Sequence, residues 1–243
     1  MNSFYGYGNL EGRYWFIGME EGCGGNWQAD VLPRFTTWHA LGRKETEDLR
    51  GFHFSIGVRK HWERVNNKAV SVQFTWRRLI ETILSAQNGS EVPIEPHDIV
   101  TYQSQHLGTQ DGDSCLLELL PLPSPNIAGF AYKNLANEQY PFFATRALYR
   151  KHIMTTRIDH IRTLMENSGT GHVVLYGTTY MPEWNALVMN AQWEQMNEFI
   201  KRCPVFGRYV WCVPHPRAWG NPRDLFQTLG YMIRETDAGN QAH

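Results

Sequence analysis

The stretch WFIGMEEG, at Trp15–Gly22, decides the fold that we expect for this chain. Its apolar first half is typical of a buried strand, and it ends in two adjacent carboxylates and a glycine. A similar stretch, YVWCV at Tyr209–Val213, leads to His215, whose backbone is restrained by a proline on either side. Open α/β folds place their ligand crevices at the carboxyl ends of the strands. The sequence therefore predicts that Glu20, Glu21 and His215 lie at such an edge.

Two more apolar runs have the character of buried parallel strands, because each is short and is followed by Gly or Pro. They lie at Cys115–Leu120 and Val173–Tyr176, which brings the expected core to four strands. The economical arrangement is an α/β protein, a three-layer α/β/α sandwich with a central, mostly parallel four-stranded sheet. Helical spacing of apolar residues predicts helices over Phe74–Leu84, Phe143–Met165, Trp193–Ile200 and Asn221–Ile233.

Length and composition indicate one domain. The chain has 243 residues, 42% of them hydrophobic, so we expect a single domain over residues 1–243 with a frayed tail at 237–243. No signal-peptide pattern and no Cys-x-x-Cys spacing occur, which predicts a cytoplasmic protein with reduced thiols. No apolar stretch approaches the ~18 residues of a membrane span. We expect a monomer with neither a metal ion nor a cofactor, since the histidines and cysteines lack ligand spacing.

The charge pattern leaves a nucleic-acid partner open. A net charge of −1, taken as a sum, argues against strong phosphate binding. Basic residues nevertheless cluster between Arg146 and Arg162, and again around Arg217. The first cluster, with Arg146 and Arg150, is interpreted either as a DNA-binding face or as the solvated side of a helix.

Four segments resemble, in the same order, the motifs of the uracil-DNA glycosylase superfamily. The first is similar to the superfamily's water-activating loop, with Glu20 at the position of its Asp or Asn. The second is similar to the segment whose Asn contacts the extruded base, and Glu118 stands in place of that Asn. The last is similar to the His-Pro-Ser-Pro motif, of which His215 and Pro216 match. The four segments are Gly18–Gly22, Leu117–Leu122, Val173–Thr178 and His215–Trp219.

This resemblance implies a monofunctional DNA glycosylase, which flips a base out of the duplex and hydrolyses its N-glycosidic bond to leave an abasic site. That reaction builds positive charge on the deoxyribose and negative charge on the departing base. Glu20, with Glu21 as the alternative, would activate water and stabilise the sugar cation. His215 would donate a hydrogen bond to the base. Arg217 or Trp219 would fill the gap that the flipped base leaves.

The predicted contacts to the flipped base are Glu118, Met19, Trp27 and Phe35. An ionised Glu can only accept hydrogen bonds, whereas cytosine presents an amine donor, so Glu118 favours a cytosine-derived base over uracil. The superfamily includes a bacterial anti-phage member that excises glucosylated hydroxymethylcytosine from phage DNA, and the resemblance implies this substrate. The aromatic segment Gly51–Asn67 is the candidate for contacts to the hexose.

Three alternatives share parts of this pattern. A repair glycosylase for uracil or another deaminated base would keep the fold and His215. A non-catalytic DNA-binding protein would keep the basic helix and would not need Glu20. A nucleoside hydrolase would cleave free nucleosides and would gain little from Arg217.

Overall fold

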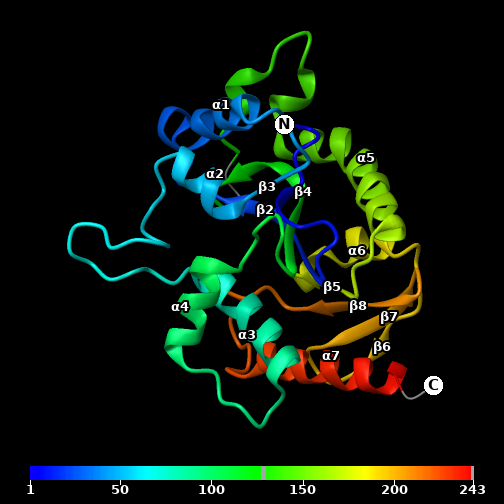
Figure 1. The fold of residues 1–243 in the computed structure, drawn as a ribbon. Helices are drawn as coiled ribbons and strands as arrows, with labels where there is room; N and C mark the ends of the chain where they lie inside the picture. The colour runs from blue at the N-terminus through cyan, green and yellow to red at the C-terminus, as the bar shows by residue number, and fades with distance from the viewer. Residues whose placement is uncertain (127–129, 242–243) are drawn as a thin grey trace.

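The computed structural model describes residues 1–126 and 130–241, which form one mixed β-sheet of eight strands with helices around it (Figure 1). The order of the strands across the sheet is β3-β1-β4-β2-β5-β8-β7-β6. Their bounds are β1 Gly6–Gly8, β2 Tyr14–Gly22, β3 Thr46–Glu47, β4 Ser114–Ser124, β5 His172–Tyr176, β6 Glu194–Gln195, β7 Lys201–Val205 and β8 Arg208–Val213.

The four core strands expected from the apolar runs are confirmed as β2, β4, β5 and β8, which are neighbours and pair in parallel. The predicted sheet of four strands is wrong in extent. β1 pairs antiparallel with β4 and β7 antiparallel with β8, while β3 and β6 form the outer edges. These added strands are short and partly polar, and their strand conformation comes from pairing with an existing sheet edge rather than from an apolar pattern.

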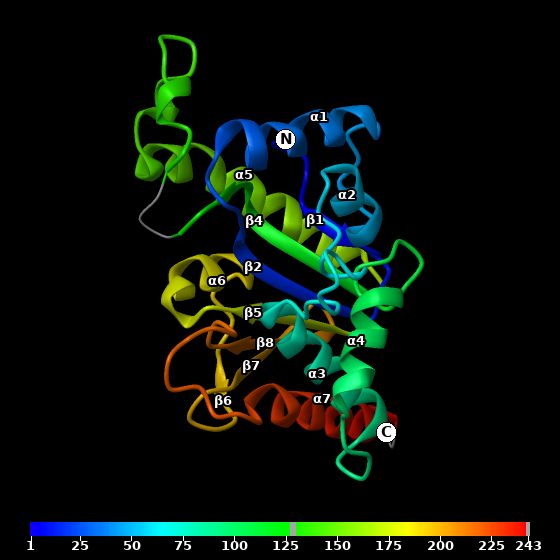
Figure 2. The same cartoon turned by 90° about the vertical axis from the view of Figure 1, so that its left-hand side faces the viewer.

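Helices cover both faces of the sheet, which confirms the α/β class (Figure 2). Successive side chains of a strand point to opposite faces, so Phe16 packs beneath α2, α3, α4 and α7, whereas Trp15 and Ile17 pack beneath α5 and α6. The helices are α1 Leu32–Ala40, α2 Leu49–Ser55, α3 Phe74–Asn88, α4 Pro96–Gln105, α5 Arg146–Asn167, α6 Met181–Leu187 and α7 Leu225–Gln241.

The helix predicted over Trp193–Ile200 does not form. This segment contains β6 and the turn that leads into β7. The side-chain oxygen of Asn197 accepts hydrogen bonds from the backbone N–H groups of Phe199 and Ile200, at 2.9 and 2.8 Å. Asn side chains that bond to the following backbone favour turns over helices, and this local bond outweighs the helical spacing of the apolar residues.

The other predicted helices exist with shifted ends. α5 begins at Arg146, not at residue 143, because the Thr145 hydroxyl caps its first turn by accepting from the N–H of Leu148 at 3.2 Å. α7 begins at Leu225, because the side chain of Asn221 donates to the carbonyl of His215 at 2.9 Å and does not cap the helix.

The chain near Asp237 is ordered in a helix, which differs from the frayed tail expected at 237–243. α7 continues to Gln241. The carboxylate of Asp237 accepts from Arg13 at 2.6 Å and lies 2.9 Å from Nε2 of His172, which fastens this helix to the sheet. Residues 242–243 of the predicted tail lie outside the described residues.

Candidate active site

The carboxyl ends of the parallel strands bring the predicted site residues to one edge of the sheet. In the register of β2 and β4, Gly18 lies opposite Glu118, and the last residue of β5, Tyr176, lies opposite Val213 of β8. The chain passes from β2 to β4 on one side and from β5 to β8 on the other. The carboxyl ends of β2 and β5 therefore flank the topological switch point, where α/β proteins bind ligands.

Glu20 is turned toward α5. Its Oε1 forms an ion pair with Arg146, the first residue of that helix. Arg146 also donates to the hydroxyl of Ser124 at the end of β4, at 3.0 Å. Burial raises the pKa of the Glu20 carboxyl above its usual value, and Arg146 opposes this rise by favouring the ionised form. The ionised form of Glu20 is thus favoured by Arg146 and, more weakly, by the charge of Arg150.

Glu21 is turned the other way, as expected for the next residue of a strand. It accepts hydrogen bonds from the Tyr7 hydroxyl at 2.9 Å and from Arg34 at 2.7 Å, and Nε2 of His53 lies 3.5 Å away. Burial alone would raise the pKa of Glu21, but Arg34 and His53 together hold it well below its usual value. Glu21 is a permanently ionised carboxylate whose two oxygens are both engaged.

Glu118 presents a different carboxyl. The residue is half-buried, and its Oε1 accepts from the Tyr176 hydroxyl at 3.2 Å. Its Oε2 is buried and has no hydrogen-bond partner within residues 1–126 and 130–241. A Cβ on Gly18 would lie 2.5 Å from this oxygen and 2.3 Å from the Tyr176 hydroxyl, so only glycine leaves room for the pair. Burial, followed by the negative charge of Glu21, raises the pKa of Glu118 to about 8.

The raised pKa changes what Glu118 can do for a base. At neutral pH most of its carboxyl groups carry a proton, so the side chain can both donate and accept. A neutral carboxyl complements the acceptor and amine of cytosine and also the imide of uracil. The preference for cytosine that we expected from an ionised Glu118 therefore applies only above about pH 8.

His215 lies in the loop that follows β8. Its Nδ1 accepts a hydrogen bond from the backbone N–H of Arg217 at 3.1 Å, which assigns the ring proton of the neutral imidazole to Nε2. Burial, together with the charge of Arg217, lowers the pKa of His215 below its usual value. The Tyr176 ring lies edge-on to the imidazole, with centroids 5.6 Å apart. Tyr176 therefore contacts both Glu118 and His215.

The two candidate wedge residues differ in exposure. The Trp219 side chain is 101% exposed and makes no use of its apolar surface. Arg217 is also exposed, and it lines a cavity of about 290 Å³ together with Phe74 and Arg78 of α3. A fully solvated tryptophan at the tip of a loop beside a basic cavity has no packing role, which leaves it available to a partner.

The three remaining candidates for base contact lie around β2. Met19 is buried in the core beneath α5. Trp27 and Phe35 are half-buried and pack against each other, with ring centroids 6.0 Å apart. Trp27 also meets the edge of Tyr132. Met19 is thus part of the core, while the two aromatic rings keep some exposed surface.

Three arginines of the basic cluster on α5 are engaged within the fold, whereas Lys151 of the same cluster is exposed. Arg146 is paired with Glu20, and Arg150 is paired with Glu183 at 2.5 Å. Arg157 is 1% exposed, and it donates to the carbonyls of Asn2, Phe4, Glu118 and Leu119 at 2.6–2.8 Å. These arginines organise the site and the fold from within, which neither interpretation of the cluster had anticipated.

Three aromatic rings of the segment expected to contact a hexose are inaccessible, although residues 64–67 at the end of that segment are exposed. Phe52, His53 and Trp62 are buried in the core beneath α2 and α3. His53 approaches Glu21, and Trp62 packs against Trp76 with centroids 5.5 Å apart. These rings therefore support the carboxylate network and are not a sugar-binding surface.

Sequence reasoning missed the partners of the carboxylates: Tyr7, Arg34, His53 and Tyr176. Tyr176 had a usable signal, because it ends a predicted strand just before Gly177, as the acidic residues end theirs. Arg34, Tyr7 and His53 come from segments with no motif, and only the packing of α1, β1 and α2 brings them to Glu21.

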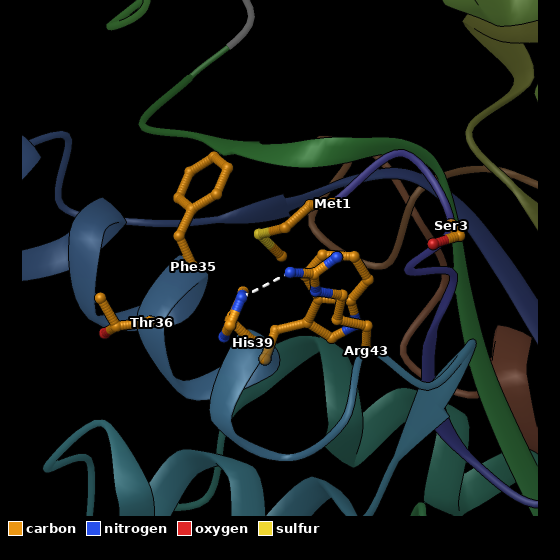
Figure 3. A pocket seen from close by; sticks show the side chains of 7 residues that line it. Met1, Ser3, Phe35, Thr36, His39 and Arg43 are labelled. Atoms are coloured by element: carbon orange, nitrogen blue, oxygen red, sulfur yellow. Dashed lines mark hydrogen bonds between the residues drawn. The ribbon is translucent and has the colours of Figure 1, made fainter.

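A larger cavity lies beside α1, and Phe35, one of the residues predicted to contact the base, lines it. It has a volume of about 660 Å³ and is lined by Met1, Trp38, His39 and Arg43, among others (Figure 3). His39 and Arg43 are hydrogen-bonded to each other there. Over residues 1–126 and 130–241, no group of three or more His, Cys, Asp or Glu side chains is arranged to hold a metal ion. No helix in the same residues combines the length and apolarity that a bilayer crossing requires.

No protein-family model matches this chain, and a search among curated proteins finds no match. The function is therefore inferred from the site alone.

Proposed function

We propose that this protein is a DNA glycosylase that hydrolyses the N-glycosidic bond of a flipped base without cutting the strand. The observation that carries the proposal is the set of side chains at one sheet edge. Carboxylates end β2, and a neutral imidazole, whose Nε2–H meets no acceptor in the described part of the chain, follows β8. Between them, Tyr176 contacts both Glu118 and His215. This set supplies the anion and the donor that N-glycosidic cleavage requires.

In the proposed reaction, a water molecule attacks C1′ of the deoxyribose as the bond from C1′ to the base nitrogen breaks. Glu20 accepts a proton from that water, and the electron pair of the broken bond leaves with the base. His215 donates a hydrogen bond through Nε2 to a base carbonyl, where negative charge develops. The base then takes up a proton. Glu21, ionised and held by the Tyr7 hydroxyl and by Arg34, supplies a fixed negative charge that favours the sugar cation.

The proposed substrate is a modified cytosine, with glucosylated hydroxymethylcytosine as the form to test first. A cytosine-directed enzyme has to reject the plain cytosine that fills every genome, and polar contacts to a sugar achieve discrimination of ~10⁴-fold when their absence leaves buried polar groups unpaired. Uracil is the second candidate, favoured by one observation: the pKa of Glu118, about 8, keeps a neutral carboxyl that pairs with uracil as well.

The test is incubation of the purified protein with three DNAs, followed by alkaline cleavage at abasic sites. The DNAs are glucosylated-hydroxymethylcytosine phage DNA, matched unmodified DNA and a uracil oligonucleotide. Cleavage of the first alone supports the anti-phage substrate, and cleavage of the uracil oligonucleotide alone indicates a repair enzyme. If the protein binds DNA but cleaves none of the three DNAs, its function is DNA binding and not catalysis.

The residue assignments are tested with Glu20→Gln, Glu21→Gln and His215→Ala. Each is expected to lower single-turnover excision by 10²-fold or more, the usual scale for a general base or an oxyanion donor. Glu166→Gln and His97→Ala are matched controls, because both side chains are exposed and far in sequence from the site. Full activity in a folded Glu20→Gln variant would refute the water-activating role of Glu20.

A further inference from the structure

Residues 57–73 form an exposed hairpin-like segment between α2 and α3. Val65 and Lys68 pair antiparallel, and the N–H of Lys68 donates to the carbonyl of Val65 at 3.0 Å. The two residues between them, Asn66 and Asn67, both have left-handed backbone angles, with φ of 51° and 60°. This is the two-residue turn that hairpins favour, and asparagine tolerates it better than most residues. The tip therefore has a defined shape.

The base of this hairpin is fastened to the core. The buried Gln103 of α4 donates to the carbonyls of His61 and Ser71, at 2.7 and 3.3 Å. Ser71 donates through its N–H to the carbonyl of Lys60 at 2.8 Å, and Trp62 is 7% exposed within the aromatic core. In Figure 1 the segment, drawn in cyan, projects away from the body of the molecule. A fixed base with a projecting tip holds the tip's side chains at the surface.

The hairpin is strongly basic although the whole chain is not. Arg59, Lys60, Arg64 and Lys68 are all exposed, and Glu63 is the one acidic residue among positions 57–73. Glu63 lies 3.3 Å from Arg59 in an exposed pair. Arg64 and Lys68 flank the turn, so two positive charges stand at the tip of a segment whose chain as a whole carries a net charge of −1.

The hairpin is joined directly to the candidate site. It leads into α3, whose first residue, Phe74, lines the basic cavity together with Arg78 and Arg217. The same cavity includes Ala218, next to the fully exposed Trp219. At its other end, His53 of α2 approaches Glu21. The segment thus begins and ends beside residues of the carboxyl edge.

We propose that the hairpin at 57–73 is a second DNA-contacting element, which binds backbone phosphates of the duplex that flanks the flipped base. The proposal rests on the proposed function, because it assigns the surface that holds that enzyme's DNA. Lys and Arg neutralise phosphates without reading sequence. The hairpin could therefore bind the duplex around a target base whatever the flanking sequence. Because Arg146, Arg150 and Arg157 of α5 are bound within the fold, we assign the phosphate contacts to the exposed basic residues of the hairpin.

The tip chemistry favours DNA over a lipid surface. Membrane-binding elements insert large apolar or aromatic side chains beside their basic residues. Residues 64–68 contain no aromatic residue, and Val65, 37% exposed, is their one large apolar side chain. The hairpin tip can attract anions, but apart from Val65 it has no large apolar side chain to insert into a bilayer.

The experiment compares the full-length protein with its Arg64→Gln/Lys68→Gln variant. Binding to a short unmodified duplex is followed by fluorescence anisotropy at several salt concentrations. If each side chain holds one phosphate, the slope of log Kd against log salt falls by roughly 2. Between about 50 and 200 mM salt, the factor by which Kd rises would then be about tenfold smaller for the variant than for the wild type. Lys44→Gln/Arg234→Gln, which removes the same charge at exposed positions outside the hairpin, is expected to keep the wild-type slope.

The fold of the variant is checked by its urea midpoint, which is expected to be unchanged because both side chains are exposed. An unchanged slope and affinity in a folded variant would overturn the proposal, as would wild-type protein that binds anionic vesicles but no duplex. If the slope falls as expected while no DNA is excised, the hairpin assignment stands and the glycosylase proposal fails. If excision is intact and DNA affinity does not depend on the hairpin, the glycosylase proposal stands and the hairpin assignment fails.

Discussion

Replacing Glu118 by Gln removes a carboxyl that the folded protein keeps protonated, and this makes the stability of the protein less sensitive to pH. Burial and the charge of Glu21 raise the pKa of Glu118 from 4.5 to about 8. The folded state therefore holds this proton more tightly than the unfolded chain does. The contribution of Glu118 to stability is fully present below about pH 4.5 and is lost as the pH rises through about 8.

The magnitude follows from the width of that interval. At about 1.4 kcal/mol per pH unit, the loss between pH 4.5 and pH 8 reaches a ceiling of about 5 kcal/mol. Water that reaches the half-buried residue lowers this ceiling, and we expect ~2–4 kcal/mol. Gln is close to Glu in shape, carries no charge and can still accept from the Tyr176 hydroxyl.

The assay is urea denaturation of the wild type and of the Glu118→Gln variant over a pH series from about 5 to 9. The variant is expected to gain stability relative to the wild type as the pH rises from about 5 to about 8, and the difference should level off above pH 8. Glu166→Gln, at an exposed position on α5, is the control and should show no such trend. A difference between Glu118→Gln and the wild type that stays constant across the series would refute the assigned protonation of Glu118.

Three further predictions concern the same region. Arg157→Met is expected to lower the free energy of unfolding by ~3–5 kcal/mol, measured by urea denaturation, because it leaves four carbonyl oxygens without their donor. Arg157→Lys should lower it less. Equal stability of the wild type and both variants would contradict the structural role of Arg157. Gly18→Ala is expected to lower the free energy of unfolding by ~1–3 kcal/mol by separating Tyr176 from Glu118. Gly22→Ala should change the urea midpoint little, because a Cβ at Gly22 would have no atom within 4 Å. Equal effects of the two substitutions would count against the close approach at Gly18. If the protein excises bases as proposed, the ratio of cytosine-derived to uracil excision should rise as the pH passes about 8, and a flat ratio would exclude Glu118 as the discriminating group.

The core strands could be predicted because their signal is local. β2, β4, β5 and β8 are short apolar runs that end in Gly, Pro or a charged residue, and a strand buried on both faces must be apolar at successive positions. The edge strands and the turn at Asn197 carry no such run. Their conformation comes from hydrogen bonds to neighbouring segments, which a pattern of side chains does not contain.

The candidate site was predictable in its main residues and not in their chemical states. Glu20, Glu21 and His215 end or follow predicted strands, and Glu118 lies within one, opposite Gly18 of the neighbouring strand, so the arrangement of the strands brings them to one side of the sheet. Their partners come from distant segments, as with Arg146, which lies 126 positions from Glu20 in the chain. The expectation of an ionised Glu118 failed for this reason, because its protonation depends on burial and on a neighbouring charge.

The sequence by itself determined the α/β class, the four parallel strands and the acidic and imidazole side chains at their ends, because apolar periodicity and chain order are properties of the sequence. The tertiary structure alone decided that Glu21 is held ionised by Arg34 while Glu118 keeps its proton. It also decided that the α5 arginines are used internally and that the basic hairpin at 57–73 is exposed. Charge state and exposure depend on which groups lie within a few ångströms, and only the packing of the folded chain sets those distances.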